Sequence, residues 1–395
     1  MTSAGTLLAA ASDWIADHPT SLPGRIAALR QGVPRGAMPP IVQAPASPAT
    51  VLAAPANYAG QAHAWCRALE RADSEVAARN YALPSPFGFD ADAVVPPAFF
   101  HNSRRWQRAQ LTAARGFTHF LSESFIPPFG RLDGRDLERQ LDALDGVDVA
   151  HLCHGTDVRR PSLSRQRTPW APFEEDHTTR RLETVAMRNL AVLERSGRPV
   201  FVSTPDLLSD VPRAHWCPVV VDPAQWALPR ERRGSPLRVV HAPSKSAMKG
   251  TRHIDPVLTR LRDAGAIEYR ALSGVAHDRM PGLLAEADVV IDQIGLGSYG
   301  VAACEAMAAG CAVLGHITAE VRETVRQETG RELPIVEVDP ETLEGTLVAL
   351  AEDPQLVEAA ARNGATFVRE VHDGRRSADV LLRTWIRAGE GSRRA

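Results

Sequence analysis

The segment DVVIDQIGLGSYGVAACEAMAAGCAVLG, residues 288–315, decides the fold class of this chain of 395 residues. It reads as a short apolar strand, a glycine-rich loop, a helix of small residues and a second apolar strand. A strand, a helix and a strand in this order predict two parallel strands with the helix packed on one face of the sheet. The same alternation continues on both sides, so residues 234–375 are expected to form a doubly wound α/β domain.

The N-terminal half repeats this alternation, and the chain is longer than one hydrophobic core normally serves. Strands are expected at the apolar runs, and helices in between, as follows: strands within 50–54, 117–125, 147–155 and 199–203, and helices from Gln61, at 134–145 and at 180–196. An arginine-rich polar segment, 159–182, is expected to be a loop. Proline and glycine around a charged run at 226–236 predict a linker. The expected division is an N-terminal helical extension (1–45), a Rossmann-like domain (46–228), a second one (234–375) and a C-terminal helix packing back on the first domain (376–395).

Composition limits the function classes. The chain is 44% apolar and 23% charged with a formal net charge of −2, which gives no electrostatic reason to expect nucleic acid or an anionic membrane as the main partner. It contains no run of 18 apolar residues that would span a bilayer. The five cysteines lack metal-binding spacing and predict buried free thiols in a reducing compartment. Asp13 and Asp17 interrupt the first apolar run, which therefore reads as an amphipathic helix and favours a cytoplasmic protein over a secreted one.

The segment HAPSKSAMKGT, residues 241–251, holds Lys245 and Lys249, the only two lysines in the chain. It follows an expected strand and precedes an expected helix, the position where doubly wound sheets bind ligands and where helix N-termini bind phosphate. Gly250 permits close backbone approach, and a lysine ammonium is a compact charge suited to a diphosphate. Ser244, both lysines and Gly250 are therefore expected to bind a diphosphate, with Lys249 foremost. The alternative is that both lysines are solvated surface charges and that a codon bias toward G and C explains their scarcity.

The loop 297–300, GSYG, lies between a strand and a helix in the same way, so its backbone N–H groups are expected to face a phosphate. Glu305 follows in the helix. The region 237–320 resembles the C-terminal half of retaining GT-B glycosyltransferases of family 4, which typically read E-G-F-G-x-x-x-x-E-A-M-A-x-G-x-P-V-V here. The matching residues are Tyr299, Gly300, Glu305, Ala306, Met307, Ala308 and Gly310.

This resemblance implies specific roles. Glu305 would bind the ribose hydroxyls of a nucleotide, Met280 in the M-P-x-L-L helix would lie under the base, and the diphosphate would contact Ser298, Tyr299, Gly300 and Val301. Family members usually carry another glutamate eight positions before Glu305, near the transferred sugar, but this chain has Gly297 there. Gly297 is still expected to border the sugar. Either Asp292 and Gln293 supply the polar contacts instead, or a different sugar needs none.

Polar residues also follow the strands of the N-terminal half. Asn57, Gly60 and Gln61 lie at the turn after the first strand and are expected to bind the acceptor, as is Glu123 at a later strand end. The run HGTDVR is similar to the H-G-S-D-x-R run of related transferases. His154 is therefore expected to contact a sugar hydroxyl, and Asp157 the acceptor or His154 itself. His151 is expected to lie in the core, and Asp206 to cap a helix.

The sequence therefore predicts a retaining glycosyltransferase that moves a sugar from a nucleotide-diphosphate sugar to an acceptor hydroxyl, with Lys249 stabilising the leaving diphosphate and His154 assisting. The acceptor class stays open between a carbohydrate, a lipid-linked molecule and a natural product, with peripheral membrane contact at most. We expect no metal and no other cofactor, because Asp90 and Asp92, which have metal-ligand spacing, lack a phosphate loop beside them. Two alternatives remain: a sugar-nucleotide epimerase of the same fold, and a degenerate transferase that acts as a binding partner.

Overall fold

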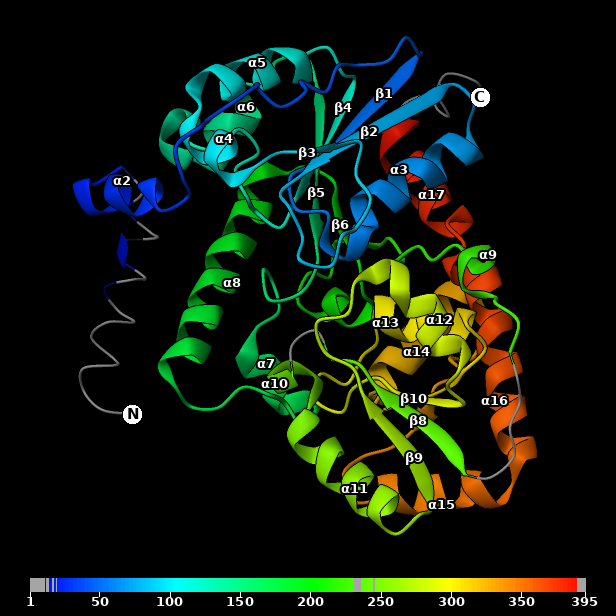
Figure 1. The fold of residues 1–395 in the computed structure, drawn as a ribbon. Coiled ribbons are helices and arrows are strands. Elements are labelled where there is room, and N and C mark those ends of the chain that lie inside the picture. Colours follow the sequence, from blue (N-terminus) through cyan, green and yellow to red (C-terminus); the bar gives the residue numbers. More distant parts are fainter. Residues whose placement is uncertain are drawn as a thin grey trace.

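The computed structural model describes residues 11, 14–15, 18, 20–230, 236–243 and 246–388. These residues form two α/β domains, which lie one above the other in Figure 1. Of the predicted N-terminal extension, α2 (Leu22–Leu29) is described, whereas most of the amphipathic segment before it lies outside the described residues.

The first domain is built on a seven-stranded parallel sheet with the order β3-β2-β1-β4-β5-β6-β7. The strands are β1 (Ala49–Ala54), β2 (Val76–Ala82), β3 (Ala93–Val94), β4 (His119–Glu123), β5 (Asp148–Cys153), β6 (Val200–Val202) and β7 (His215–Trp216). Strands are added in one direction from β1 to β3 and in the other from β4 onward. The carboxyl ends of β1 and β4 therefore form a switch point, the usual ligand position in such sheets.

The second domain has a five-stranded parallel sheet with the order β12-β11-β10-β8-β9. The strands are β8 (Leu237–His241), β9 (Ile267–Ala271), β10 (Val289–Ile291), β11 (Ala312–Gly315) and β12 (Val336–Glu337). Its switch point lies between β8 and β10. The loops that follow these two strands are the lysine-bearing segment and the glycine-rich segment identified in the sequence.

Helices cover both sheets. In the first domain they are α3 (Gln61–Ala72), α4 (Pro97–Asn102), α5 (Arg104–Ala114), α6 (Leu137–Asp142), α7 (Pro161–Arg167), α8 (His177–Ser196) and α9 (Pro223–Trp226). In the second they are α10 (Ser246–Lys249), α11 (Thr251–Asp263), α12 (Met280–Ala285), α13 (Val301–Ala308), α14 (Ala319–Thr329), α15 (Leu343–Glu352) and α16 (Pro354–Phe367). The doubly wound two-domain fold predicted from the sequence is confirmed.

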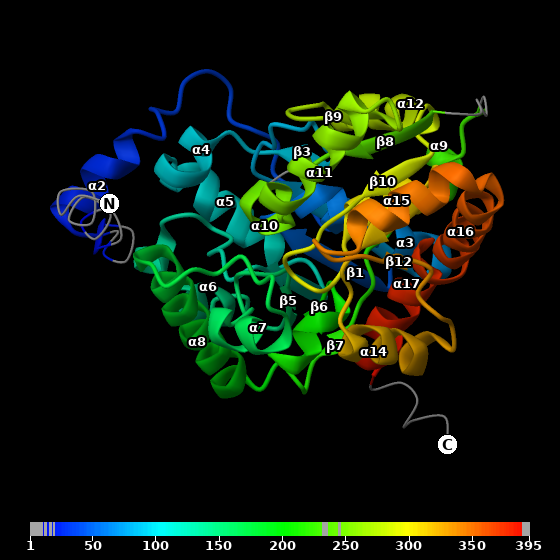
Figure 2. The same cartoon turned by 90° about the horizontal axis from the view of Figure 1, so that it is seen from below.

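The end of the chain returns to the first domain. After α16 the backbone passes through a π-helical turn, Val368–His372, into α17 (Arg375–Leu381) and a second such turn, Leu382–Ile386. Figures 1 and 2 both show α16 and α17 following each other along one side of the molecule. Leu381 and Trp385 share a buried apolar cluster with Trp65 and Leu69 of α3, so burial of apolar surface holds this segment on the first domain.

Some local predictions were wrong. The segment 159–182 is not one loop, because Pro161 occupies the first turn of α7 and α8 already begins at His177. Strand β2 and helices α4, α5, α14 and α16 were not anticipated. Five of the seven residues in β2, VAARNYA, are alanine, arginine or asparagine, so the sequence lacks the apolar pattern of a strand, and the pairing with β1 buries it. The predicted linker is described only in part, because 231–235 lie outside the described residues.

Candidate functional site

The lysine segment and the glycine segment contact each other at the switch point of the second sheet. The Ile294 N–H donates to the carbonyl oxygen of Lys249 at 3.1 Å. Gly250 has a φ of +75°, and a Cβ there would lie 3.3 Å from the Gly295 nitrogen. A larger residue would push the two segments apart, so the glycine permits this close approach. Ser244 and Lys245 lie outside the described residues, and their roles stay predictions.

Lys249 pairs with the carboxylate that follows β10. Its Nζ lies 2.5 Å from Asp292 Oδ1, and the two side chains are 17% and 4% exposed. The second oxygen of Asp292, Oδ2, is buried with no hydrogen-bond partner among the described residues. The ammonium group is therefore fixed at the strand ends, and the carboxylate beside it has spare accepting capacity.

The loop before α13 presents free backbone donors. Within the described residues, the N–H groups of residues 297–300 donate to no protein acceptor, and Gly300 occupies the N-cap position of α13. Free N–H groups that lead into a helix N-terminus attract anions. The side chains of this loop are bonded within the protein. Ser298 Oγ donates to Asp206 Oδ1 at 2.8 Å, and the Tyr299 hydroxyl lies 3.2 Å from His372 Nε2.

Glu305 pairs with His277, a contact that the sequence did not predict. Its Oε1 lies 2.8 Å from His277 Nε2, while Oε2 has no protein partner among the described residues. Burial raises the pKa of Glu305, and His277 partly offsets this rise. The same contact raises the pKa of His277. The His277 ring packs beside Phe89 of the first domain, with centroids 4.7 Å apart, so this pair lies where the two domains meet.

This pair predicts a pH-dependent stability. A histidine whose folded pKa is raised stabilises the fold fully below its unfolded pKa of about 6.5, and the contribution disappears as pH rises through the folded pKa. We expect the stability difference between the parent and His277→Ala, measured by urea unfolding, to shrink by about 1 kcal/mol between pH 6 and pH 9. His215→Ala, at an exposed histidine, is the control. A difference that stays constant with pH would contradict the assignment.

Predicted residues of the first domain meet at its own switch point. The fully buried Glu123 carboxylate accepts hydrogen bonds from the backbone N–H groups of Ala56 and Asn57, each at 3.1 Å to Oε2. His154 Nε2 lies 3.1 Å from Glu123 Oε1. Asp157 accepts from the backbone N–H groups of His154 and Gly155. Glu123 therefore holds both the loop after β1 and the His154 ring in place. The sequence contains no sign of this role, because it depends on contacts between distant segments.

The amide side chains of the first loop are bonded within the protein. Gln61 donates to the Val220 carbonyl at 3.0 Å and accepts from the Val220 N–H at 2.6 Å. Asn57 donates to the Asp90 carbonyl at 2.9 Å. Both residues are nearly buried, whereas Gly60, with φ +72°, supplies the N-cap position of α3. Acceptor binding by these three residues stays a prediction, and the contacts favour a role in shaping the loop.

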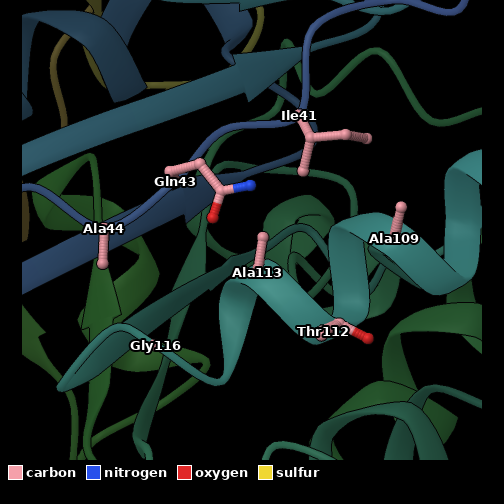
Figure 3. A pocket seen from close by; sticks show the side chains of 7 residues that line it. All are labelled: Ile41, Gln43, Ala44, Ala109, Thr112, Ala113 and Gly116. Carbon is pink, nitrogen blue, oxygen red and sulfur yellow. The ribbon is translucent and has the colours of Figure 1, made fainter.

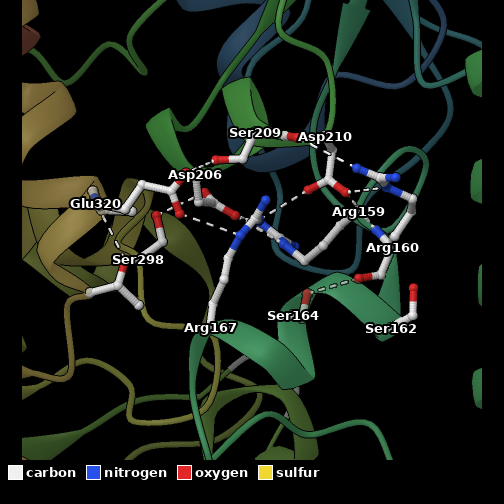
Figure 4. A network of polar contacts seen from close by, with 12 residues as sticks. Arg159, Arg160, Ser162, Ser164, Arg167, Asp206, Ser209, Asp210, Ser298 and Glu320 are labelled. Atoms are coloured by element: carbon white, nitrogen blue, oxygen red, sulfur yellow. Dashed lines mark hydrogen bonds and ion pairs between the residues drawn. The ribbon is translucent and has the colours of Figure 1, made fainter.

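A polar network joins the two domains, and Figure 4 shows its residues converging from α7, the turn Pro205–Ser209 and the second domain. Arg159 Nη2 lies 2.6 Å from Asp206 Oδ2 in buried surroundings, and Asp206 also accepts the hydrogen bond from Ser298. Arg167 Nε lies 3.4 Å from Glu320 of α14. Asp206 does not cap a helix as the sequence predicted, because Thr204 occupies the N-cap position of this turn and the Asp206 carboxylate accepts from Arg159 and Ser298.

Met280 begins α12, three residues after His277, and packs against the buried core. Its contact with a nucleobase stays a prediction. His151 is buried, as predicted. Figure 3 shows a pocket between the segment 41–44 and α5 whose lining includes no predicted site residue: Ile41, Gln43, Ala44, Ala109, Thr112, Ala113 and Gly116. Among the described residues, no group of three His, Cys, Asp or Glu side chains is placed to hold a metal, and no helix is long and apolar enough to cross a bilayer.

Comparison with known proteins gives a structural likeness only. No protein-family model and no curated protein sequence matches the chain. Sucrose-phosphate synthase from Thermosynechococcus elongatus aligns with a TM-score of 0.54 and 14% identity over 87% of this chain and 98% of that chain. HepE from Anabaena in complex with UDP-glucose aligns with a TM-score of 0.52 and 12% identity over 84% and 98%. The lipopolysaccharide glycosyltransferase WaaG aligns with a TM-score of 0.50 and 13% identity over 86% and 100%. The chain therefore has the two-domain GT-B fold that these glycosyltransferases share.

Proposed function

We propose that the protein is a retaining, metal-independent glycosyltransferase that uses a nucleotide-diphosphate sugar. The supporting observation is the convergence, at one switch point, of the Lys249 ammonium, the free N–H groups of 297–300 and the Glu305 carboxylate. A cation and N–H donors suit a diphosphate, and a carboxylate with one unbonded oxygen suits ribose hydroxyls. HepE, of the same fold, is described in complex with UDP-glucose, which makes UDP-glucose the first donor to test.

In the proposed reaction, the acceptor oxygen forms a bond to the anomeric carbon on the face that the diphosphate leaves. The bond between that carbon and the phosphate oxygen breaks, and its electron pair stays on the diphosphate. The acceptor proton passes to the departing phosphate oxygen, so no separate base is required. Lys249 and the N–H groups would stabilise the negative charge that develops on the leaving group, which is often the largest single contribution to catalysis.

His154 would contact the sugar from the first domain. Its ring is held by Glu123 and lies against Trp65 and Tyr58, with centroids 5.7 and 5.2 Å apart. A side chain fixed in this way loses little conformational freedom when a ligand binds. The two domains would have to enclose the donor. The contacts of His277 with Phe89 and of Ser298 with Asp206 support this proposal, because they join the segments proposed to bind the donor to the first domain.

Nucleotide binding tests this function directly. A thermal-shift screen of nucleotide sugars should identify the donor, because a specific ligand raises the apparent stability. Isothermal titration calorimetry with the matching nucleoside diphosphate should then show binding weakened about 10- to 100-fold in Glu305→Gln, since hydrogen bonds to a charged group are worth about 1.5–3 kcal/mol. Glu286→Gln, at an exposed pair with Arg270, serves as the control.

Two outcomes would contradict the proposal. One is a parent protein that binds no nucleoside diphosphate or nucleotide sugar. The other is an unchanged affinity in Glu305→Gln. Conversion of a donor to an isomeric nucleotide sugar without any acceptor would instead favour the epimerase alternative.

A further inference from the structure

Three buried polar atoms that have no hydrogen-bond partner among the described residues lie around the ends of two adjacent strands. They are Asp292 Oδ2 and Gln293 Oε1, which follow β10, and His316 Nε2, which follows β11. The two strands are paired in parallel, and the backbone bonds continue past them: the His316 N–H donates to the Gln293 carbonyl at 2.9 Å. Each unpartnered buried group costs about 1–3 kcal/mol, and native proteins seldom leave such groups without a ligand, a water or a function to account for them.

The imidazole of His316 has a fixed orientation. Its Nδ1 lies 2.7 Å from Glu337 Oε1. The other oxygen of Glu337 is held by the Ile317 N–H at 3.0 Å and by Arg322 Nη2 at 2.9 Å. An ionised carboxylate only accepts hydrogen bonds, so Nδ1 carries a hydrogen and Nε2 is the ring atom available to a ligand.

The glycine-rich loop has no side chain at position 297, beside His316. Gly297 has a φ of +65°, in the left-handed region that favours glycine, and a Cβ there would lie 2.5 Å from Thr318 Cγ2. The same Cβ position is 3.8 Å from His316 Nε2. Position 297 is where the resemblance places a glutamate next to the transferred sugar. The threonine methyl group fills this space, and the imidazole borders it.

We propose that His316, oriented by Glu337, contacts a hydroxyl of the donor sugar in place of the carboxylate that is absent at position 297. Asp292 and Gln293 contribute the neighbouring acceptor oxygens. This assignment rests on the proposed function and makes it more specific. The sugar contact is made by His316 Nε2 at the end of β11 and not by a carboxylate from the glycine-rich loop. Recognition of the sugar is therefore separate from recognition of the nucleotide.

The test compares one nucleotide with and without its sugar. The ligand pair is UDP and UDP-glucose, or GDP and GDP-mannose if these are the ligands that stabilise the parent in the thermal-shift screen. We expect His316→Ala to bind the free nucleotide like the parent and to bind the nucleotide sugar about 10-fold more weakly, as expected for the loss of one hydrogen bond. His215→Ala, on an exposed edge strand, is the control.

A second variant, Glu337→Gln, tests the same role in case His316→Ala fails to fold. Glu337 is 46% exposed, so Glu337→Gln should fold normally while it loses the charged anchor of the imidazole. We expect the same selective loss of nucleotide-sugar affinity, smaller in size. Unchanged sugar-nucleotide affinity in both variants, or an equal loss for nucleotide and nucleotide sugar, would overturn the role of His316. A parent that binds neither ligand would instead refute the proposed function.

Discussion

Replacement of Lys249 by methionine is expected to lower the turnover of the nucleotide sugar by about 100-fold or more. Methionine is an unbranched side chain one heavy atom shorter than lysine, so it keeps most of the apolar stem and removes the charge and the donors. Loss of a single donor to a developing oxyanion typically reduces kcat by about 10²–10³-fold. The measurement is a steady-state assay of nucleoside diphosphate release.

The ion pair with Asp292 adds a second effect that has to be separated from the first. In Lys249→Met the buried Asp292 carboxylate loses the one side-chain partner that it has among the described residues, and a buried charge without a partner destabilises a fold. In the double variant Lys249→Met/Asp292→Asn neither charge is present. We expect the double variant to regain most of the lost stability in urea unfolding and to remain as inactive as Lys249→Met.

A matched control is available three positions further along the chain, in the first turn of α11. Arg252 pairs with Glu174 on the surface, where both side chains are more than half exposed. Arg252→Met removes a neighbouring cation without touching Asp292, and its turnover should stay near that of the parent. If Lys249→Met turns over at the parent rate, or if the double variant regains activity together with stability, the lysine does not act on the diphosphate.

Replacement of Asp206 by asparagine is expected to lower the free energy of unfolding by about 3–5 kcal/mol, because the buried cation of Arg159 would lose its partner. The variant should unfold at a lower urea concentration than the parent. Asp263→Asn, at an exposed pair with the adjacent Arg262, should differ little from the parent. A small loss in Asp206→Asn would show that water reaches Arg159.

Asp206→Asn should also lack the part of the stability that the ionised Asp206 carboxylate contributes and that the parent loses at low pH. Burial alone would raise the pKa of Asp206, but Arg159 and the hydrogen bond from Ser298 hold it below the usual value. A carboxyl with a lowered folded pKa stabilises the fold above its unfolded pKa of about 3.9, and this contribution is lost as pH falls through the folded value. We expect the parent to lose more stability than Asp206→Asn between pH 5 and pH 3. Parallel pH curves would contradict this assignment.

The sequence by itself determined the two alternating α/β domains and the two polar loops at the switch point of the second sheet. Apolar strand cores and glycine-rich turns are local features, so the run 288–315 and the segment 241–251 could be placed at strand ends without a structure. Residues at the carboxyl ends of parallel strands share one sheet edge. For this reason Lys249, Asp292 and Glu305 could be assigned to one region although 43 positions separate the first two.

Only the tertiary structure decided which side chains pair. Contacts of His277 with Glu305, of Glu123 with His154 and of Asp206 with Arg159 and Ser298 depend on strand order, on the docking of one domain against the other and on the rotamers that this docking permits. None of these has a local signal, because each joins residues 28 or more positions apart. The role inferred for His316 was also hidden, since it follows from an atom left without a partner, which is a property of the packed protein and not of the sequence.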